Sequence, residues 1–252
     1  MLSAIALTPG AWLAAAAAIL FAAVLRGFTG FGFAIAAVPL VSLVMPPSRT
    51  VAAVVVMQVA IGLRDCFAEW RQADRKVLVR LTLGALAGMP IGVAALAMLP
   101  ASAVRLVLGA LVLVAVVLTW KPRRATQPPH AGVTLATGFA SGLSQGLAAM
   151  AGPPAVTYFL AFEPRLAVMR SSLMVLFPMV SLLGLPMVAV AGLLDSTALV
   201  LAALGMPLML GGGWVGAAAF RRFGGRSYRP LAIGALLITA AASITRALFD
   251  LL

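Results

Sequence analysis

The chain has 252 residues, of which 63% are hydrophobic and only 10% are charged, whereas soluble domains carry about 25% charged residues. This balance excludes a soluble enzyme and a disordered chain, and the single cysteine, Cys66, excludes a scaffold of internal disulfides. The net charge of +12 does not indicate nucleic-acid binding, because the cations fall in short breaks between apolar runs. Long unbroken apolar runs predict an integral membrane protein made of helices rather than a barrel.

The first apolar stretch covers residues 11–45 and has an unusual length. The ten residues before it contain no Lys or Arg, so we expect this stretch to be retained rather than cleaved as a signal peptide. It is too long for one crossing of about 20 residues and too short for two crossings with a turn. GFTGFG at 27–32 interrupts it, and residues 33–45 then supply only about 20 Å of helix. We predict a longer and a half-length helix, arranged as a re-entrant hairpin or as two tilted crossings.

A second irregular stretch covers residues 131–162. SGLSQG at 141–146 and a Gly-Pro-Pro sequence at 152–154 interrupt it. The apolar run at 50–63 becomes long enough to cross once its flank up to Trp70 is included. The sequence therefore predicts an all-α polytopic membrane protein of about ten helical segments, about eight to ten of which cross. The other crossings are expected at 77–99, 103–120, 171–192, 197–220 and 229–249.

The charged connections predict how these crossings are oriented. Segments 64–76, 121–124 and 221–229 are rich in Arg and Lys, which places them in the cytoplasm by the positive-inside rule. The connections at 99–102 and 192–196 carry no cation and are expected outside. Either arrangement of residues 11–45 then places both termini outside.

Short sequence matches indicate an internal repeat. Residues 1–120 are interpreted as the first transmembrane repeat, 121–130 as a cytoplasmic linker and 131–252 as the second repeat. The basic and uncharged connections exchange places between the halves, so we predict that the repeats are inverted, an arrangement common in secondary transporters. The matches occur in the same order: Gly27-Phe28 before Pro39 with Gly138-Phe139 before Pro153, Gly88-Met89-Pro90 with Gly205-Met206-Pro207, and Gly109-Ala110-Leu111 with Gly234-Ala235-Leu236.

These motifs carry a family resemblance over nearly the whole chain. Residues 27–33, GFTGFGF, followed by Ala37-Val38-Pro39-Leu40, resemble the first-repeat signature of the sulfite exporter TauE/SafE family of anion transporters, and residues 141–153 resemble its second-repeat counterpart. The family has a denser glycine run where this chain reads GLAAMAG at 146–152. The resemblance implies a transporter in the bacterial inner membrane for small sulfur-containing or organic anions, such as sulfite, sulfoacetate or sulfonates.

The two breaks are the predicted substrate site. Half-helices that begin after Gly32 and Gly152 would point their N-termini into a shared cavity, where free N–H groups and the helix dipole favour an anion. Side-chain donors would add to this effect. The opposing interpretation is that the glycines only allow close helix packing. The candidate substrate-binding residues are Arg26, Gly27, Thr29, Gly30, Gly32, Pro39, Gln58, Ser141, Gly142, Ser144, Gln145, Gly152, Pro153 and Arg170.

Three of these polar residues have alternative interpretations. Arg26 either binds the anion by bidentate hydrogen bonding or extends to the membrane interface. Arg170 either faces the site or is one of the cytoplasmic cations. Gln58 either lines the pathway or bonds a neighbouring helix. The GxxxGxxxG ladder of Gly84, Gly88 and Gly92 is interpreted as helix packing.

The motifs that the sequence lacks exclude several functions. The sequence has no phosphate-binding loop, and one His and one Cys cannot build a metal site, so no cofactor is expected. Glu163 is the only carboxylate near the predicted pathway, so a carboxylate proton relay is unsupported. We expect a secondary transporter that works by alternating access, with an anion channel or a membrane accessory protein as alternatives. The expected partners are a small anion and the lipid bilayer, with no nucleic acid, and a homodimer is left open.

Overall fold

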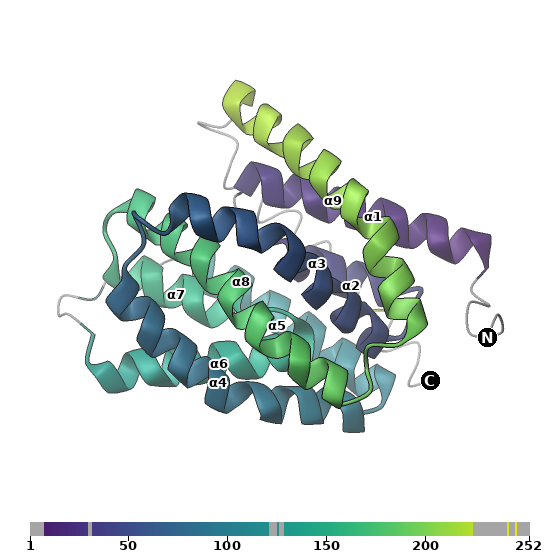
Figure 1. The fold of residues 1–252 in the computed structure, drawn as a ribbon, viewed down its shortest axis with the longest axis horizontal. Coiled ribbons are helices and arrows are strands. Elements are labelled where there is room, and N and C mark those ends of the chain that lie inside the picture. The colour runs from purple at the N-terminus through teal and green to yellow at the C-terminus, as the bar shows by residue number, and fades with distance from the viewer. Residues whose placement is uncertain are drawn as a thin grey trace.

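The computed structural model describes residues 8–29, 32–120, 125, 129–223, 241 and 245. Within these residues the chain is helical and contains no strand (Figure 1). This confirms the all-helical class, while the crossing predicted at 229–249 lies almost entirely outside the described residues. The helices are α1 (Pro9–Thr29), α2 (Phe33–Val41), α3 (Pro47–Glu69), α4 (Arg75–Met98), α5 (Ala101–Trp120), α6 (Ala131–Ala148), α7 (Gly152–Phe162), α8 (Leu166–Val190) and α9 (Ser196–Phe223).

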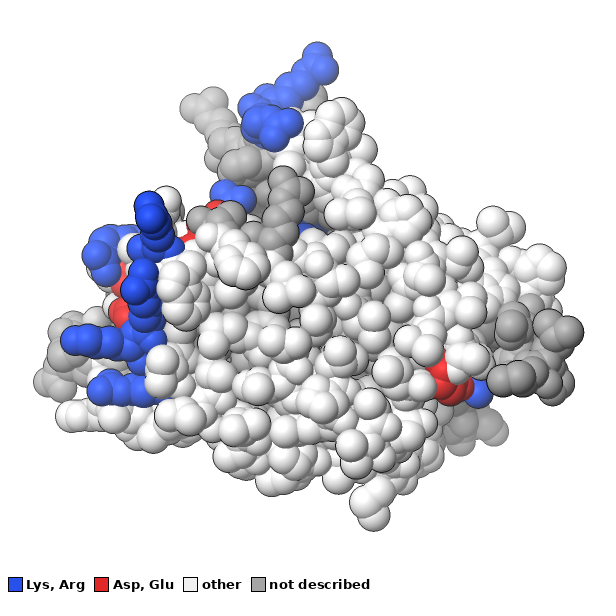
Figure 2. Space-filling view, viewed as in Figure 1, with Lys and Arg blue, Asp and Glu red and all other residues white. Residues whose placement is uncertain are grey.

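Several of these helices have the dimensions of membrane spans. In the described part of the chain, four helices are long and apolar enough to cross: α1, α4, α8 and α9. Figure 2 shows most of the visible charged residues on the left and along the upper edge of the molecule, with one small group at the lower right and a broad uncharged face between them. A belt of apolar side chains between charged ends is what a bilayer requires. The chain is therefore a multi-pass membrane protein.

Two helices are too short to cross a bilayer by themselves. α2 has 9 residues and α7 has 11, so they extend over about 14 and 17 Å. The end of α2 lies beside the beginning of α5, where Arg105 donates from Nε to the carbonyl oxygen of Ser42 at 2.8 Å. The end of α7 bonds the connection after α5, since the Ala125 amide donates to the Ala161 carbonyl at 3.0 Å. Both half-helices were predicted from the length of the apolar stretches.

Glycines bring α4 and α6 into backbone contact. A Cβ on Gly84, Gly88 or Gly92 would overlap the carbonyl oxygens of Leu135, Phe139 and Leu143, respectively. The opposing helix contributes its own glycines at the same spacing of four residues. The ladder therefore packs two helices at close range, as small residues do in membranes, and the packing interpretation of the ladder is confirmed. The glycines on the α6 side are Gly138, Gly142 and Gly146.

A second glycine contact joins α1 to α9. A Cβ on Gly27 would overlap the Gly213 carbonyl, and a Cβ on Gly216 would overlap the Val24 carbonyl. The α1–α9 pair forms one edge of the molecule, and the α4–α6 pair forms the opposite edge (Figure 1). Between these edges α3 packs against α8, and the crossing is close because Gly62 lies directly against Pro178. The two half-helices begin beside this central crossing.

Candidate functional site

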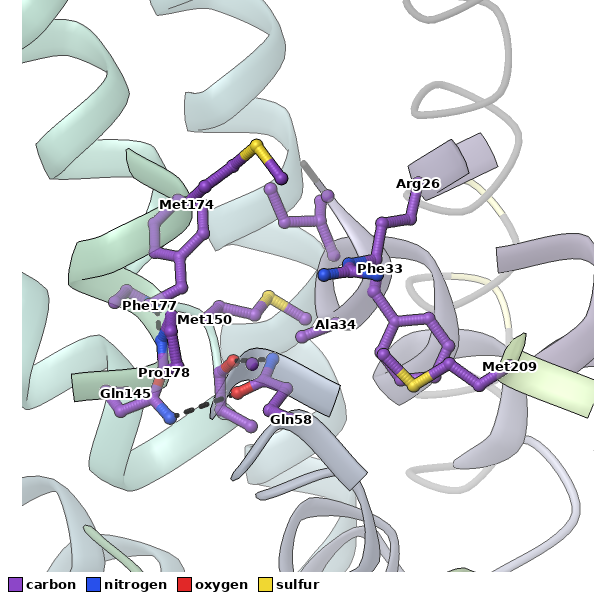
Figure 3. Close-up of a pocket in the computed structure, with 16 residues that line it drawn as sticks. Arg26, Phe33, Ala34, Gln58, Gln145, Met150, Met174, Phe177, Pro178 and Met209 are labelled. Atoms are coloured by element: carbon purple, nitrogen blue, oxygen red, sulfur yellow. Dashed lines mark hydrogen bonds between the residues drawn. The ribbon is translucent and has the colours of Figure 1, made fainter. Parts of the chain in front are cut away.

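A small cavity lies where α2 and α7 begin (Figure 3). Its volume is about 50 Å³, which is space for roughly three to five water molecules. Five of the candidate residues predicted from the sequence line it, and they come from five different parts of the fold. These residues are Arg26 of α1, Gly32 before α2, Gln58 of α3, Gln145 of α6 and Gly152 of α7.

The first break turns the chain at Gly32. This residue has a φ of 91°, a left-handed conformation that is accessible to glycine at little cost. α2 follows at once, and its N-cap position carries no side-chain hydrogen bond. The first amides of a helix have no acceptor within the helix. Phe33, Ala34 and Ile35, which form this first turn, all line the cavity, so the turn presents the positive end of the helix dipole to the cavity.

The second break turns the chain at Ala149, which ends α6 with a φ of 54°. α7 begins three residues later at Gly152, again without a side-chain cap from its own N-cap residue. Ala149, Met150, Ala151 and Gly152 all line the cavity. The second half-helix therefore directs its N-terminus to the same cavity as the first.

The two N-termini are close neighbours. A Cβ built on Gly152 would lie 3.3 Å from Cδ1 of Ile35 in the first turn of α2. Because two helix N-termini share one small cavity, their partial positive charges add there. An anion is the ligand that such an arrangement stabilises.

Arg26 adds a full positive charge to this region. It lies in the last turn of α1 and lines the cavity. Figure 3 shows its side chain extending toward Phe33 at the beginning of α2. Within the described residues, the cavity lining contains no Asp, Glu or His. Among the described residues of the lining, Arg26 therefore carries the only formal charge.

Two glutamines supply the polar groups on the other side of the cavity. Gln145 donates from Nε2 to Oε1 of Gln58 at 3.3 Å, and Gln58 donates from Nε2 to the carbonyl of Ala149 at 3.2 Å (Figure 3). Gln58 thus bonds residues of another helix and also lines the cavity.

The remaining candidates of the second half lie outside the cavity lining. Ser144 donates its hydroxyl to the Ala140 and Ser141 carbonyls of its own helix. Ser141 is buried, and its Oγ has no hydrogen-bond partner among the described residues. A Cβ on Gly142 would overlap the Ala85 carbonyl of α4, so this glycine lies within the close contact between α4 and α6. Pro153 is buried in the first turn of α7, and Arg170 is exposed on α8.

Two candidates of the first half, Gly27 and Pro39, also lie outside the cavity lining. Gly27 packs against α9, and Pro39 is buried inside α2. Thr29 ends α1, but its side chain, like Gly30, lies outside the described residues.

The sequence predictions missed the apolar wall of the cavity. Methionines at helical spacing are indistinguishable from ordinary core residues in a chain this apolar, so no local signal marks them. A proline inside a helix is noticeable in a sequence and could have pointed to this region. Pro178 of α8 packs against Gly62 at the α3–α8 crossing beside the cavity. The wall consists of Phe33, Met150, Met174, Phe177 and Met209.

Comparison with known proteins identifies the family. The family model described as sulfite exporter TauE/SafE matches residues 15–243. The chain belongs to the TauE/SafE family. Searches of curated proteins and of solved structures found no significant match. Members of this family are membrane transporters and not enzymes, and the apolar helices of this TauE/SafE protein agree with that role.

Proposed function

We propose that this TauE/SafE protein is a secondary transporter that moves a small sulfur-containing or organic anion through the cavity between its half-helices. The candidate anions are sulfite, sulfoacetate and related sulfonates. One observation carries the proposal: two helix N-termini and Arg26 meet at a single cavity whose described lining has no acidic residue. An anion buried in a low-dielectric site needs such donors and charge to replace its water.

The dimensions of the cavity favour compact anions. Its volume of about 50 Å³ suits a single oxyanion group better than a sulfonate that also carries a carboxylate. The apolar wall of Phe33, Phe177 and the methionines offers no further ionic partner. Within the proposed range, sulfite is therefore the first candidate, and sulfoacetate requires the cavity to widen.

The helix contacts support the proposal of two repeats, residues 1–120 and 131–252, joined by the linker at 121–130. Exchanging the halves converts the α1–α9 contact into α6–α4, and both contacts are present. The same exchange converts α4–α8 into α9–α3 and α2–α3 into α7–α8, which are also present. Half-helices related in this way would approach the midplane from opposite sides, as alternating access by inverted repeats requires.

The proposed orientation follows from the charges. Exposed cations gather where α3 passes into α4, at Arg71, Arg75, Lys76 and Arg80, and we place this end in the cytoplasm. Asp195, before α9, then lies outside with its ion-pair partner Arg49 at 2.6 Å. We place the protein in the bacterial inner membrane with both termini outside. A homodimer stays a prediction.

Transport by purified protein in liposomes tests the function. Uptake of labelled sulfite, thiosulfate, sulfoacetate and carboxylates is measured with and without preloaded anion. Acceleration by preloaded anion supports a carrier, whereas rapid conductance without countertransport identifies an anion channel. Absence of anion movement in both assays would leave an accessory role and refute the proposal.

Cysteine labelling tests the orientation. Cysteines are placed singly at positions 124, 195 and 224 in a chain whose Cys66 is replaced by Ala. Positions 124 and 224 should react only with a reagent that enters the cell, and position 195 with an impermeant one. Labelling of all three positions from one side would refute the inversion of the halves.

A further inference from the structure

A closed set of hydrogen bonds surrounds the α6–α7 break. The Ala151 amide donates to Oε1 of Gln145 at 3.1 Å, and Nε2 of Gln145 donates to Oγ of Ser181 at 2.9 Å. Ser181 donates to Oε1 of Gln58 at 2.6 Å, and Nε2 of Gln58 donates to the Ala149 carbonyl at 3.2 Å. We call these four bonds the amide relay. It begins and ends on the two residues that flank Met150 in the break.

The direction of the bonds assigns a particular role to Ser181. Each group in the relay donates to the next, an arrangement in which hydrogen bonds polarise and strengthen one another. A carboxamide has a donor end and an acceptor end, so its orientation depends on its neighbours. Ser181 accepts from Gln145 and donates to Gln58, and its single hydroxyl therefore matches the orientation of both amides. Reversing either amide would place two donors or two acceptors together at the break.

Water cannot easily take the place of Ser181 in these hydrogen bonds, because the groups around it are buried. Ser181 is 0% exposed and Gln145 is 2% exposed. The relay also connects distant parts of the chain, because Gln58 lies in α3, Gln145 in α6 and Ser181 in α8. Without the hydroxyl, Oε1 of Gln58 and Nε2 of Gln145 would keep only their direct bond of 3.3 Å. Each would lose its shorter bond to Ser181, at 2.6 and 2.9 Å respectively, which is costly at a site that is largely buried.

We propose that Ser181 is a positioning residue that fixes the α6–α7 break and thereby sets the affinity of the cavity for its anion. Ser181 is not among the residues that line the cavity, whereas Ala149 and Ala151 are. It therefore acts through Gln58 and Gln145 on the backbone that forms the N-terminus of α7. This inference rests on the proposed function, because it assumes that this N-terminus binds the transported anion.

A purely structural role for Ser181 would give a different experimental result. A serine that only joins helices would contribute to stability without changing the break. Hydrogen–deuterium exchange of peptides covering residues 149–152 separates the two roles, since the Ala151 amide is itself a donor in the relay. This measurement needs no substrate, so it remains informative if no anion is transported.

The experiment compares Ser181→Ala, Ser181→Cys and Ser181→Thr with the wild-type protein in liposomes. Ala and Cys remove the strong hydroxyl, and Cys does so at nearly unchanged volume. We expect exchange at 149–152 to accelerate about tenfold and KM for the transported anion to rise about tenfold, with maximal rate changed less. Thr retains the hydroxyl and should restore both values toward wild type. Thr50→Val is the control, because Thr50 is buried and its hydroxyl donates to the Pro46 carbonyl at the start of its own helix, at 3.1 Å.

Each result has a defined meaning. Unchanged exchange in Ser181→Cys overturns the relay as the determinant of the break. Faster exchange with unchanged KM overturns the link to anion affinity. Faster exchange in a protein that transports no anion supports the relay while refuting the proposed function. If Ser181→Ala does not fold, Ser181→Cys supplies the same comparison without an empty space in the core.

Discussion

Gly152, the first residue of α7, lies against Ile35 in the first turn of α2, with a Cβ at position 152 reaching 3.3 Å from Cδ1 of Ile35. The two residues are more than one hundred positions apart and belong to different halves of the sequence. Their contact brings two helix N-termini to one cavity. Any side chain at position 152 therefore grows into the space that we assign to the anion.

Enlarging Gly152 should reduce transport in steps. Gly152→Ala places its methyl in tight but adjustable contact and should lower anion uptake a few-fold. Gly152→Val should lower uptake at least about tenfold, because overpacking a filled site costs about 1–3 kcal/mol. Liposome uptake normalised to folded protein measures the effect. Gly132→Ala, at a glycine with open space around it, should leave uptake unchanged. Wild-type uptake by Gly152→Val would place the anion elsewhere.

Replacing Arg26 should weaken anion binding strongly. A hydrogen bond to a charged group contributes about 1.5–3 kcal/mol, so Arg26→Gln should raise KM by about tenfold to a hundredfold. Arg26→Lys keeps the charge but loses the planar fork of donors, so it should restore only part of the affinity. The matched control is Arg80→Gln, because Arg80 is an exposed arginine of α4. Equal KM values in Arg26→Gln and wild type would show that Arg26 does not contact the anion.

The helical class and the two half-helices could be predicted because both depend on length. A bilayer requires about 20 apolar residues per crossing, so stretches of the wrong length stand out in the sequence. The first break was located correctly, since α2 begins after Gly32, which adopts a left-handed conformation. The interruption predicted at 141–146 was wrong, because α6 continues through these residues to Ala148, and only the one at 152–154 coincides with a helix boundary. Ala149 adopts a similar conformation without being a glycine, so residue type alone does not mark the second turning point.

The partners of each polar residue could not be predicted in the same way. Ser144 and Gln145 are adjacent in the sequence, yet the first bonds its own helix and the second bonds α3, α8 and the start of α7. This difference depends on which side of α6 faces the centre of the bundle, and a helix apolar on all sides gives no such information. Ser181 went unnoticed because nothing around it in the sequence distinguishes it from other helix serines.

Substitution of Gly142 distinguishes a role in helix packing from a role in anion binding. A Cβ there would overlap the Ala85 carbonyl of α4, so Gly142→Ala should push the two helices apart and destabilise the fold by about 1–3 kcal/mol. The thermal unfolding midpoint in detergent and the monodisperse fraction should both fall, while KM of the folded remainder stays unchanged. A raised KM at unchanged stability would instead assign Gly142 to the anion site.

The connection between α7 and α8 should make stability depend on pH in the acid range. Hydrogen bonds from the Arg165 side chain, at 2.9 and 3.2 Å, hold the pKa of Glu163 below its ordinary value of 4.5, and the Arg165 amide adds to this effect. A lowered pKa in the folded state contributes stability above the ordinary value, and that contribution is lost as pH falls through the folded pKa. Glu163→Gln should therefore unfold at a lower temperature than wild type at pH 7, and the difference should disappear as the pH is lowered well below 4.5. Thermal unfolding of both proteins in detergent across this range measures the difference, and Arg165→Gln should show the same convergence. A difference that stays constant from neutral to acid pH would show that the ionisation of Glu163 does not contribute to the stability of the fold.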